Sequence, residues 1–466
     1  MTSTNIEFNP ALIRRYDKAG PRYTSYPTAV QFQENFGEPE YRQAAEASNV
    51  AHRQGQARPL SLYFHLPFCS KVCFFCGCSK VVTKFRDRAA PYLTRLHQEI
   101  ALQARLFDNG RQVDQLHWGG GTPTFISHAE MQALMAQTRR HFTLHDDDSG
   151  EYSIEIDPRE IDGETLGVLR QLGFNRVSLG VQDFDPRVQA AVNRIQPEAQ
   201  TMAAISGARA LGYKSISVDL IYGLPLQSVA SFNATLDKII DLSPDRLSVF
   251  NYAHLPQMFK PQRRINAADL PSPQEKLVIL QQAIDKLTSA GYVYIGMDHF
   301  AKPDDELAVA QREGKLYRNF QGYSTHADCD LIAMGITAIG KVGNTFSQNV
   351  KTLDQYYACI DAGHLPVYRG LALSDDDLLR QQVISELICH FGLRIPAIEQ
   401  AYGVVFADYF ATELRELSAM QDDALVELSP ERITVYPAGR LLIRNICMVF
   451  DKYLRQQARQ AYSKVI

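Results

Sequence analysis

Cysteine is scarce in this chain and unevenly distributed. Eight cysteines occur in 466 residues, and four of them, Cys329, Cys359, Cys389 and Cys447, stand singly. Disulfide-stabilised secreted domains carry cysteine at a much higher density and at paired spacings, so the composition excludes a disulfide framework. The opening stretch MTSTNIEFNP has no basic region followed by an apolar one, and we therefore expect no secretory signal.

Long apolar runs and an excess of one charge are also missing. No stretch approaches the roughly 18 uncharged apolar residues of a membrane-spanning helix. The 48 basic and 52 acidic residues give a net charge of −4, which creates no general attraction for nucleic acid or for an anionic membrane. We expect a cytoplasmic protein with reduced thiols and without nucleic-acid or membrane partners. The absence of a long heptad pattern or exposed apolar stripe predicts a monomer.

Short apolar runs alternate with helical patterns from about residue 60 onward. The runs are LSLYFHL, VDQLHW, YSIEID, NRVSLGV, SISVDLIYG, DRLSVFNYA and YVYIGMD. Strand followed by helix, repeated without a hairpin signal, predicts parallel β/α units. Polar residues stand at or near the ends of five runs: Glu155, Gln182, Asp219, Asn251 and Asp298. Because strand ends converge on one mouth in a β/α barrel, these residues favour a barrel over an open doubly wound sheet.

The two ends of the chain differ from this pattern. Residues 1–58 are polar and irregular, and their prolines argue against a continuous helix through IRRYDKAGPRYTSYPTAVQF. After about residue 365, amphipathic helices, a hairpin around SPER and a long helix from AGRLLIRNIC onward predict a mainly helical, winged-helix-like domain. We therefore expect an α/β protein with an irregular N-terminal arm (1–58), a full or partial (open) β/α barrel (59–365) and a helical C-terminal domain (366–466).

The stretch HLPFCSKVCFFCGCSK contains the other four cysteines: Cys69, Cys73, Cys76 and Cys78. A structural zinc site usually combines two C-x2-C pairs, and no second pair follows Cys73 and Cys76. Three cysteines on a 4Fe–4S cluster would leave one iron open to another ligand. The spacing C-x3-C-x2-C therefore favours a 4Fe–4S cluster, with zinc as the alternative.

A glycine-rich stretch, LHWGGGTPTF, follows the second expected strand. Gly119, Gly120 and Gly121 have no side chains, so the backbone can approach a ligand closely and hydrogen-bond to it. An ordinary strand-to-helix turn is the alternative. Because the cysteine run follows the preceding strand of the same barrel, we favour a ligand-binding role.

Several longer strings carry a resemblance to a known family. They include GPRYTSYPTA, YFHLPFCSKVCFFCGC, HWGGGTPT, SIEIDPRE, LGVQDF, DLIYGLP and DRLSVFNYAHLP. Over nearly its whole length the chain resembles the oxygen-independent coproporphyrinogen III oxidases (dehydrogenases) of the radical S-adenosylmethionine (radical SAM) superfamily. The resemblance implies a radical SAM type of partial barrel, a 4Fe–4S cluster and S-adenosylmethionine, with two molecules of the latter per chain.

The activity implied by the resemblance is a step of haem and porphyrin biosynthesis. Two propionate side chains of coproporphyrinogen III are oxidatively decarboxylated to vinyl groups, giving protoporphyrinogen IX, by way of a 5′-deoxyadenosyl radical. The cofactor supplies the reactivity and the protein orients it. An electron donor such as flavodoxin or ferredoxin would be the redox partner.

The resemblance also assigns roles to single residues. The cluster ligands would be Cys69, Cys73 and Cys76, and catalytic roles would fall to Tyr63, His65 and Cys78. The positions that match cofactor-binding positions are Tyr63, Phe75, Gly119, Gly120, Gly121, Thr122, Glu155, Gln182, Arg194, Asp219, Ala253 and Ile339. Because carboxylates favour bidentate arginine partners, Arg14, Arg15 and Arg22 are the candidate contacts to the substrate.

Two alternatives remain open at this point. Haem-binding chaperones on the same fold have the cluster, but they typically lack the GPRYTSYPT arm and follow the third cysteine with Asp-Phe, where this chain has Gly77 and Cys78. A nucleic-acid-modifying radical SAM enzyme would fit a winged-helix-like domain. Its only basic support is a modest set of charges near the C-terminus: Lys452, Arg455, Arg459 and Lys464.

Overall fold

The computed structural model describes residues 6–56, 58–327 and 329–456, which fall into two compact units. The barrel unit comprises Phe32–Pro271 and Asp328–Ala372. The composite unit is assembled from Met1–Gln31, Ser272–Ala327 and Leu373–Ile466. The expected domains 1–58, 59–365 and 366–466 are continuous in sequence, whereas each of the two units combines separate stretches of the chain. The expected division stays a prediction.

Parallel strands form the main sheet of the barrel unit, in the spatial order β9, β8, β7, β6, β4, β1, β14. Their bounds are β1 (Leu60–Leu66), β4 (Gln112–Gly120), β6 (Glu151–Ile156), β7 (Arg176–Gln182), β8 (Ser215–Tyr222), β9 (Arg246–Asn251) and β14 (Asp330–Met334), and the short β5 (Thr143–Leu144) pairs with β4. The α/β class and the partial (open) β/α barrel are thereby confirmed.

Three antiparallel strands extend the sheet beyond β14. They are β15 (Ile339–Val342), β16 (Thr345–Asn349) and β17 (Val367–Ala372). The sequence analysis identified neither β14 nor this extension. β14, β15 and β16 are each only four or five residues long and are separated by turns at Gly335 and Gly343, so they are too short for a clear strand pattern.

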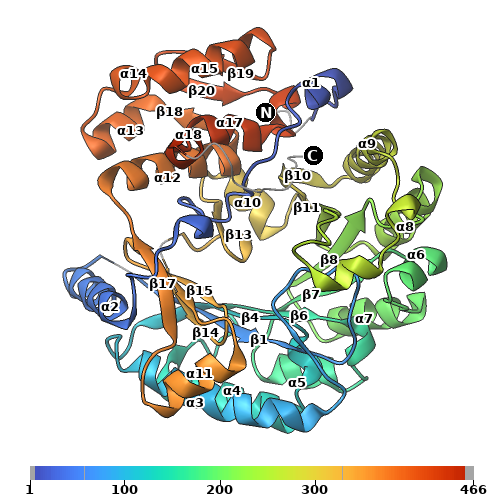
Figure 1. The fold of residues 1–466 in the computed structure, drawn as a ribbon, viewed down its shortest axis with the longest axis vertical. Coiled ribbons are helices and arrows are strands. Elements are labelled where there is room, and N and C mark those ends of the chain that lie inside the picture. Colours follow the sequence, from blue (N-terminus) through green and yellow to red (C-terminus); the bar gives the residue numbers. More distant parts are fainter. Residues whose placement is uncertain (1–5, 57, 328, 457–466) are drawn as a thin grey trace. The chain divides into compact units, whose positions relative to one another are not determined.

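Helices form an outer arc around the parallel strands (Figure 1). Their bounds are α3 (Ala90–Ala104), α4 (His128–His141), α5 (Thr165–Gln171), α6 (Pro186–Ala191), α7 (Glu198–Ala210), α8 (Val229–Leu242) and α11 (Leu353–Asp361). Phe64 of β1 packs against Trp118 of β4, and Trp118 packs against Phe174 next to α5. Because successive strand residues point to opposite faces, Tyr63 and His65 face the barrel interior.

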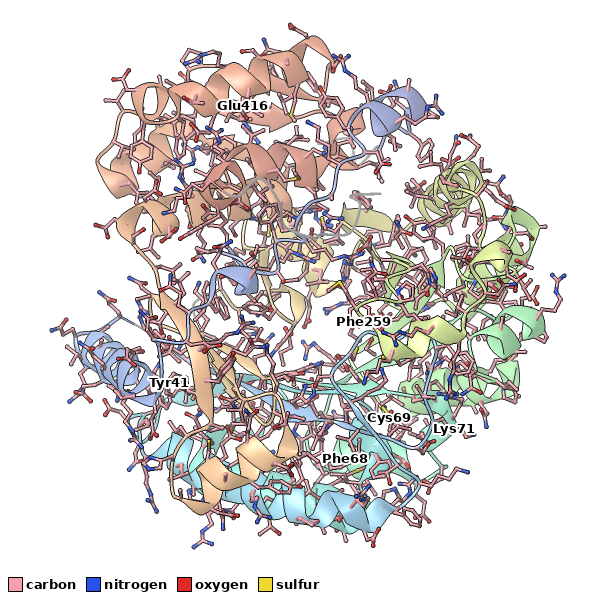
Figure 2. The ribbon with its side chains drawn as sticks, viewed as in Figure 1. Tyr41, Phe68, Cys69, Lys71, Phe259 and Glu416 are labelled. Atoms are coloured by element: carbon pink, nitrogen blue, oxygen red, sulfur yellow. The ribbon has the colours of Figure 1, made fainter. Side chains whose placement is uncertain are left out.

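Helix α2 (Glu38–Arg53) corrects the expectation of an irregular N-terminal arm. Its first turn is capped by the Glu40 carboxylate, which accepts a hydrogen bond of 2.8 Å from the Gly37 amide. The buried face consists mainly of small residues, including Ala44, Ala45 and Ser48, around the fully enclosed Tyr41 (Figure 2). With few large apolar residues the segment has a low mean hydropathy, and it therefore resembled a polar, irregular stretch in the sequence.

A buried ion pair joins four parts of the barrel unit. Arg111, just before β4, donates to Asp330 at the start of β14 at 2.6 Å, and the two side chains are 0% and 3% exposed. Arg111 also donates to Asn49 of α2 at 3.1 Å, and Ser48 of α2 donates to Asp330. The backbone amide of Gly343, in the turn between β15 and β16, donates to Asp330 at 2.8 Å. The pair therefore fixes β14, termed here the return strand, relative to the start of β4.

A second buried carboxyl group, Glu99 of α3, stabilises the segment that follows β14. It accepts hydrogen bonds from the Gly335 amide (2.8 Å), the Asn349 amide group (2.9 Å) and the Tyr356 hydroxyl (2.6 Å). Burial raises the pKa of Glu99 to about 7, although the three donors act in the opposite direction.

The composite unit is mainly helical, as expected for its C-terminal part. Its helices are α1 (Pro10–Arg15), α9 (Pro273–Ser289), α10 (Glu306–Arg312), α12 (Asp375–His390), α13 (Ile395–Tyr402), α14 (Phe406–Tyr409), α15 (Ala411–Asp422), α16 (Pro437–Arg440), α17 (Ile443–Val449) and α18 (Lys452–Gln456). Its strands are β10 (Val293–Gly296), β11 (His299–Ala301), β12 (Tyr317–Asn319), β13 (Gly322–Ser324), β18 (Gly392–Arg394), β19 (Val426–Leu428) and β20 (Arg432–Val435). The expected hairpin around SPER is the β19–β20 pair.

Two sequence expectations for this unit were wrong. The run YVYIGMD does not continue the parallel series, because β10 pairs antiparallel with β11 after a turn with positive φ at Gly296 and Met297. The long C-terminal helix is divided into α16, α17 and α18. Asp451 accepts hydrogen bonds from the amides of Tyr453 and Leu454, at 2.9 and 3.3 Å, and so begins a new helix there. Residues 457–466 of the expected helix lie outside the described residues.

The N-terminal segment packs on C-terminal elements of the composite unit. Arg15 forms an ion pair of 2.6 Å with Asp423, and Arg22 forms one of 2.8 Å with Asp298. Within the described residues, no helix is both long enough and apolar enough to cross a membrane.

Substituting Arg111 with methionine should destabilise the barrel unit by about 3–5 kcal/mol, because Asp330 would stay buried after losing its directly hydrogen-bonded cation, with only Arg58 Nη1 left 3.8 Å away. Trp118, the single tryptophan of the chain, is fully buried in this unit, so its fluorescence in urea reports the unfolding. The double variant Arg111→Met/Asp330→Asn should lose less than the sum of the single variants. Arg187→Met, at a 70% exposed side chain, is the matched control. A loss below about 1 kcal/mol in Arg111→Met would contradict the assigned role.

The stability contributed by Glu99 should depend on pH. Its folded-state pKa of about 7 lies above the ordinary value of 4.5, so the folded protein binds the proton more tightly than the unfolded chain does. The contribution is therefore full below pH 4.5 and is lost as the pH rises through 7. The difference in unfolding free energy between the native chain and Glu99→Gln should shrink by on the order of 3 kcal/mol between about pH 4.5 and pH 8. Glu130→Gln, which keeps the exposed cap of α4, should show no such change; a pH-independent difference for Glu99→Gln would refute the assignment.

Candidate active site

The carboxyl ends of the parallel strands open into a cavity of about 320 Å³ within the barrel unit. Its lining residues come from the loop after β1, the loop after β4 and the ends of β6 to β9: Cys69, Lys71, Cys73, Phe75, Cys76, Cys78, Lys80, Gly120, Gly121, Thr122, Pro123, Glu155, Ile156, Asp157, Arg159, Ser178, Gly180, Gln182, Arg194, Asp219 and Phe250. The cysteine run, the glycine stretch and three of the five polar strand ends thus meet in one cavity, whereas Asn251 and Asp298 are not among its lining residues.

The cysteine loop, residues 70–80, is closed by backbone pairing at its base. β2 (Phe68–Cys69) runs parallel to β3 (Val81–Val82), with Cys69 opposite Val82. The Val81 amide donates to Pro67 O at 2.7 Å, and the Thr83 amide donates to Cys69 O at 2.9 Å. Figure 2 shows Cys69 and Lys71 on this segment beside Phe68. The loop is therefore held by main-chain hydrogen bonds at the point where the first cysteine enters the cavity.

Cys69, Cys73 and Cys76 each have a different polar environment. The Thr122 hydroxyl donates to Cys69 Sγ at 3.5 Å, and burial raises the pKa of that thiol to about 11. The Cys78 thiol donates to Cys76 and, with help from Lys80 and against burial, lowers the pKa of Cys76 to about 5. The same bond raises the pKa of Cys78. Cys73 is surrounded by arginine.

Two guanidinium groups converge on Cys73. Arg159 and Arg194 each place a nitrogen 3.5 Å from Cys73 Sγ. Both also pair with the buried carboxylate of Asp157, at 2.6 and 3.0 Å. Burial would raise the pKa of Asp157, but the two arginines outweigh burial and lower it. One carboxylate thus holds two cations against a thiol, an arrangement that suits a negatively charged sulfur.

The glycine stretch packs tightly against the base of the cysteine loop. A Cβ at Gly121 would lie 2.6 Å from the carbonyl carbon and oxygen of Pro67, and Gly120 has a φ of +116° with the His65 ring only 2.7 Å from a Cβ position. The Gly121 amide donates to Leu66 O at 2.9 Å. Only glycine fits at these two positions, which explains their place in the motif.

Glu155 presents a carboxylate to the cavity. It accepts a 3.0 Å hydrogen bond from the Gly120 amide, and His117 Nε2 lies 3.4 Å away. Burial would raise the pKa of Glu155, but these neighbours outweigh burial and lower it. The carboxylate sits deep in the barrel while 47% of its side-chain surface faces the cavity, so it is ionised and accessible to a ligand.

Tyr63 and His65 form a polar chain beside Glu155. The Tyr63 hydroxyl lies 3.1 Å from His65 Nδ1, and His65 Nε2 lies 3.1 Å from Ser79 O in the cysteine loop. These partners assign the proton to Nε2, and burial lowers the pKa of His65, so the ring is neutral. Tyr63 also stacks on His117 with a centroid distance of 5.8 Å. The chain connects the cavity wall to the cysteine loop.

Asp219 and Gln182 lie at the ends of the next strands. Burial raises the pKa of Asp219 to about 6; Ser248 opposes this shift, and the negative charge of Glu155 adds to it. Gln182 ends β7 with a φ of 71°, a conformation rare for residues other than glycine. Arg194 donates to Gly180 O at 2.5 Å, so the guanidinium that contacts Cys73 also reaches the end of β7.

The sequence analysis missed several residues of the site. Asp157 and Arg159 lie in the quoted string SIEIDPRE but received no role, and Lys80 and His117 were not singled out. The buried Gln262 donates to Phe75 O at 2.9 Å and to Ala253 O at 3.2 Å, and so joins two of the expected positions. These residues act through contacts between distant segments, and a motif in one segment carries no signal for them.

Some expected residues are not among those that line the cavity. Ile339 begins β15 and is not among the residues that line the cavity in the described part of the chain. Arg14, Arg15 and Arg22 belong to the composite unit, where Arg14 is exposed and the other two are paired with carboxylates. Their proposed contact with a substrate stays a prediction.

The residues present fit an iron–sulfur cluster and a zwitterionic ligand. Cys69, Cys73 and Cys76 all line one cavity, so their sulfurs can serve as thiolate ligands. The cavity also offers three carboxyl groups (Glu155, Asp157 and Asp219) and two guanidinium groups (Arg159 and Arg194), which match the amino and carboxylate groups of an amino acid. Cys69, Cys73 and Cys76 form no disulfide, so no thiol of the set is consumed in one.

Two family models match separate parts of the chain. Residues 63–239 match the family model described as the radical SAM superfamily, and residues 373–442 match the model described as the HemN C-terminal domain.

Similar proteins align with the chain over nearly all of its length. The chain is 54% identical over 461 residues to an oxygen-independent coproporphyrinogen III oxidase of Pseudomonas aeruginosa, with 99% of each chain covered. It is 53% identical to the protein of that name from Escherichia coli K12, with 100% of each covered. A solved structure titled as coproporphyrinogen III oxidase (HemN) from Escherichia coli, a radical SAM enzyme, superimposes with a TM-score of 0.91 at 52% identity, covering 97% of this chain and 100% of that one. The chain belongs to the family of oxygen-independent coproporphyrinogen III oxidases within the radical SAM superfamily.

Proposed function

We propose that this protein decarboxylates two propionate side chains of coproporphyrinogen III to vinyl groups without oxygen, giving protoporphyrinogen IX for haem synthesis. One observation carries the proposal: about half of all residues are identical, over the full length, to proteins that bear this name. The same names favour this function over the haem-binding chaperone and over the nucleic-acid-modifying enzyme. Each propionate loses one hydrogen from its β-carbon, carbon dioxide and one electron.

Membership of the radical SAM superfamily implies a 4Fe–4S cluster and S-adenosylmethionine. Cys69, Cys73 and Cys76 would hold the cluster, leaving one iron open. Together the two groups supply, when bound, a carbon radical strong enough to remove hydrogen from an unactivated C–H bond. Arg159 and Arg194 would lower the energy of negative charge on the cluster sulfurs through their contact with Cys73.

The chain's own groups would orient the S-adenosylmethionine. The Glu155 carboxylate, held by Gly120 and exposed to the cavity, suits an ammonium group, and the glycine stretch with Thr122 suits close backbone contact. A second molecule would contact Phe75, Gln182, Arg194, Asp219 and Ala253. Two decarboxylations per substrate make a second molecule chemically reasonable.

Tyr63, His65 and Cys78, the expected catalytic positions, have two proposed tasks. Tyr63 and His65 would keep the cysteine loop at a fixed distance from the cavity wall, because their chain of contacts ends on Ser79. Cys78, next to the cluster ligands, would act as a donor to a neighbouring sulfur and not as a fourth ligand.

Several further assignments extend the proposal. A flavodoxin or ferredoxin would supply electrons, and Arg14, Arg15 and Arg22 would contact the carboxylates of the tetrapyrrole. The protein would act as a monomer in the cytoplasm.

The release of 5′-deoxyadenosine tests the proposed function. Anaerobically reconstituted protein would be given S-adenosylmethionine and dithionite, with and without coproporphyrinogen III. Release stimulated by the porphyrinogen, with loss of two carboxyl groups from it, is the expected result. Binding of a tetrapyrrole without stimulated release would overturn the proposal in favour of a haem-binding chaperone.

Serine at any of Cys69, Cys73 or Cys76 should prevent assembly of the cluster. We expect iron to fall from about four atoms per chain to a small fraction of that after reconstitution, with loss of the brown sulfur-to-iron absorption. Cys359→Ser, on the outer helix α11, should load iron as the native chain does. Full loading of Cys76→Ser with loss in Cys78→Ser would show that the ligand set was assigned wrongly.

Glu155→Gln should weaken binding of S-adenosylmethionine by about tenfold to hundredfold, because a charged hydrogen-bond partner is lost while the side-chain size is kept. Calorimetric titration of the cluster-loaded protein measures the affinity directly. Glu130→Gln on α4, remote from the cavity lining, should bind as the native chain does. An unchanged affinity in Glu155→Gln would remove this carboxylate from the binding site.

A further inference from the structure

A basic and apolar surface, termed here the loop face, lies on the outer side of the cysteine loop. It consists of Lys71, which also lines the cavity, and of Val82, Lys84, Phe85, Arg86 and Arg88. Phe85 is 69% exposed and Val82 is 45% exposed, although both are apolar. An exposed aromatic ring surrounded by cations is a composition typical of protein-binding surfaces.

The loop face is continuous in space with the cluster-binding loop. β3 places Val82 opposite Cys69 in the β2–β3 pair, about 5 Å away. Glu160 links the two arms of the surface, because it accepts a hydrogen bond from Ser70 in the loop and forms a 3.1 Å ion pair with Arg86. Val82 is therefore a direct neighbour of Cys69, the first proposed cluster ligand, and the exposed residues 84–88 follow it closely in the chain.

The charge of the loop face contrasts with that of the whole chain. The chain carries a net charge of −4, whereas the four cations of this face are accompanied by one exposed acid within it, Asp87. In the part of the chain that the structure describes, neither Lys71 nor Lys84 forms an ion pair. Unpaired surface cations around an apolar centre attract an acidic partner and accelerate its approach.

We propose that the loop face is the docking site of a small acidic protein that carries a one-electron redox centre and reduces the cluster. This inference rests on the proposed function, in which the cluster must accept an electron. In the transfer, the donor loses one electron and the cluster gains it, with no bond formed or broken. Val82 and Phe85 do not line the cavity, so a protein can cover them while the cavity holds its ligands. Their position beside Cys69 gives the electron a short path.

The test compares two reductants of the same cluster. Cluster-loaded protein without porphyrinogen is mixed with reduced, acidic flavodoxin or with dithionite, and bleaching of the cluster is followed by stopped flow. We expect Lys84→Glu/Arg88→Glu and, separately, Phe85→Ala to slow reduction by flavodoxin at least tenfold and to leave the dithionite rate unchanged. The flavodoxin rate of the native chain should fall steeply with added salt, and that of the charge-reversed variant should not.

The chain offers a matched control for charge. Arg105 and Arg140 are exposed, lie at the C-terminal ends of α3 and α4, and both act electrostatically on His141. Arg105→Glu/Arg140→Glu changes the net charge by the same amount at the opposite end of the β/α units, and it should reduce normally with flavodoxin. Equal slowing in both double variants would overturn the proposal, because it would reflect net charge alone.

Two further outcomes are informative. If the variants of the loop face reduce normally with flavodoxin but raise the KM for coproporphyrinogen III in a dithionite-driven assay, the surface guides the substrate and the proposal is wrong. If flavodoxin reduces the cluster through the loop face but no decarboxylation occurs with either reductant, the proposed function fails and the docking site stands.

Discussion

The barrel depends on a buried charge pair that lies far from its cavity. Asp330 begins the return strand β14, and Arg111 precedes β4, so their contact fixes both neighbours of β1 at once. The same carboxylate accepts hydrogen bonds from α2 and from the turn at Gly343, so four segments share one anion. The cysteine loop follows the opposite, carboxyl end of β1. The position of the cysteines proposed as cluster ligands therefore depends on an ion pair at the opposite end of the strands.

The cavity follows the same rule of local charge balance. Burial alone would neutralise carboxyl groups such as Glu155 and Asp157. Glu155 is kept ionised by a backbone amide and a histidine, and Asp157 by two arginines, which it in turn orients toward Cys73. These two carboxylates have their partners within the wall, so their faces directed into the cavity remain available to ligands. Glu155, which is both ionised and accessible, is the clearest example.

The sequence predicted the parts of this structure that local pattern or motif encodes. The bounds of β1 agree with the run LSLYFHL, because one apolar run forms one buried strand. α2 escaped because its buried face is made of alanine and serine, and the seventh strand was misassigned because the turn at Met297 reverses the chain with no common turn dipeptide. In the site, the cysteines and glycines were identified by spacing. Arg159 was not, because its partner Cys73 stands 86 residues away and only the fold brings the two together.

The closure of the cysteine loop has a consequence for the life of the protein in the presence of oxygen. The loop is held by β2–β3 pairing, by the Phe74 amide on Val192 O at 2.9 Å and by Asn193 on Val72 O at 2.7 Å, and none of these bonds involves a sulfur. Damage to an iron–sulfur cluster therefore leaves the loop's supports intact. Repair of the cluster then requires only that iron and sulfide return to a loop that keeps its conformation. The protein need not be unfolded, refolded by a chaperone or degraded.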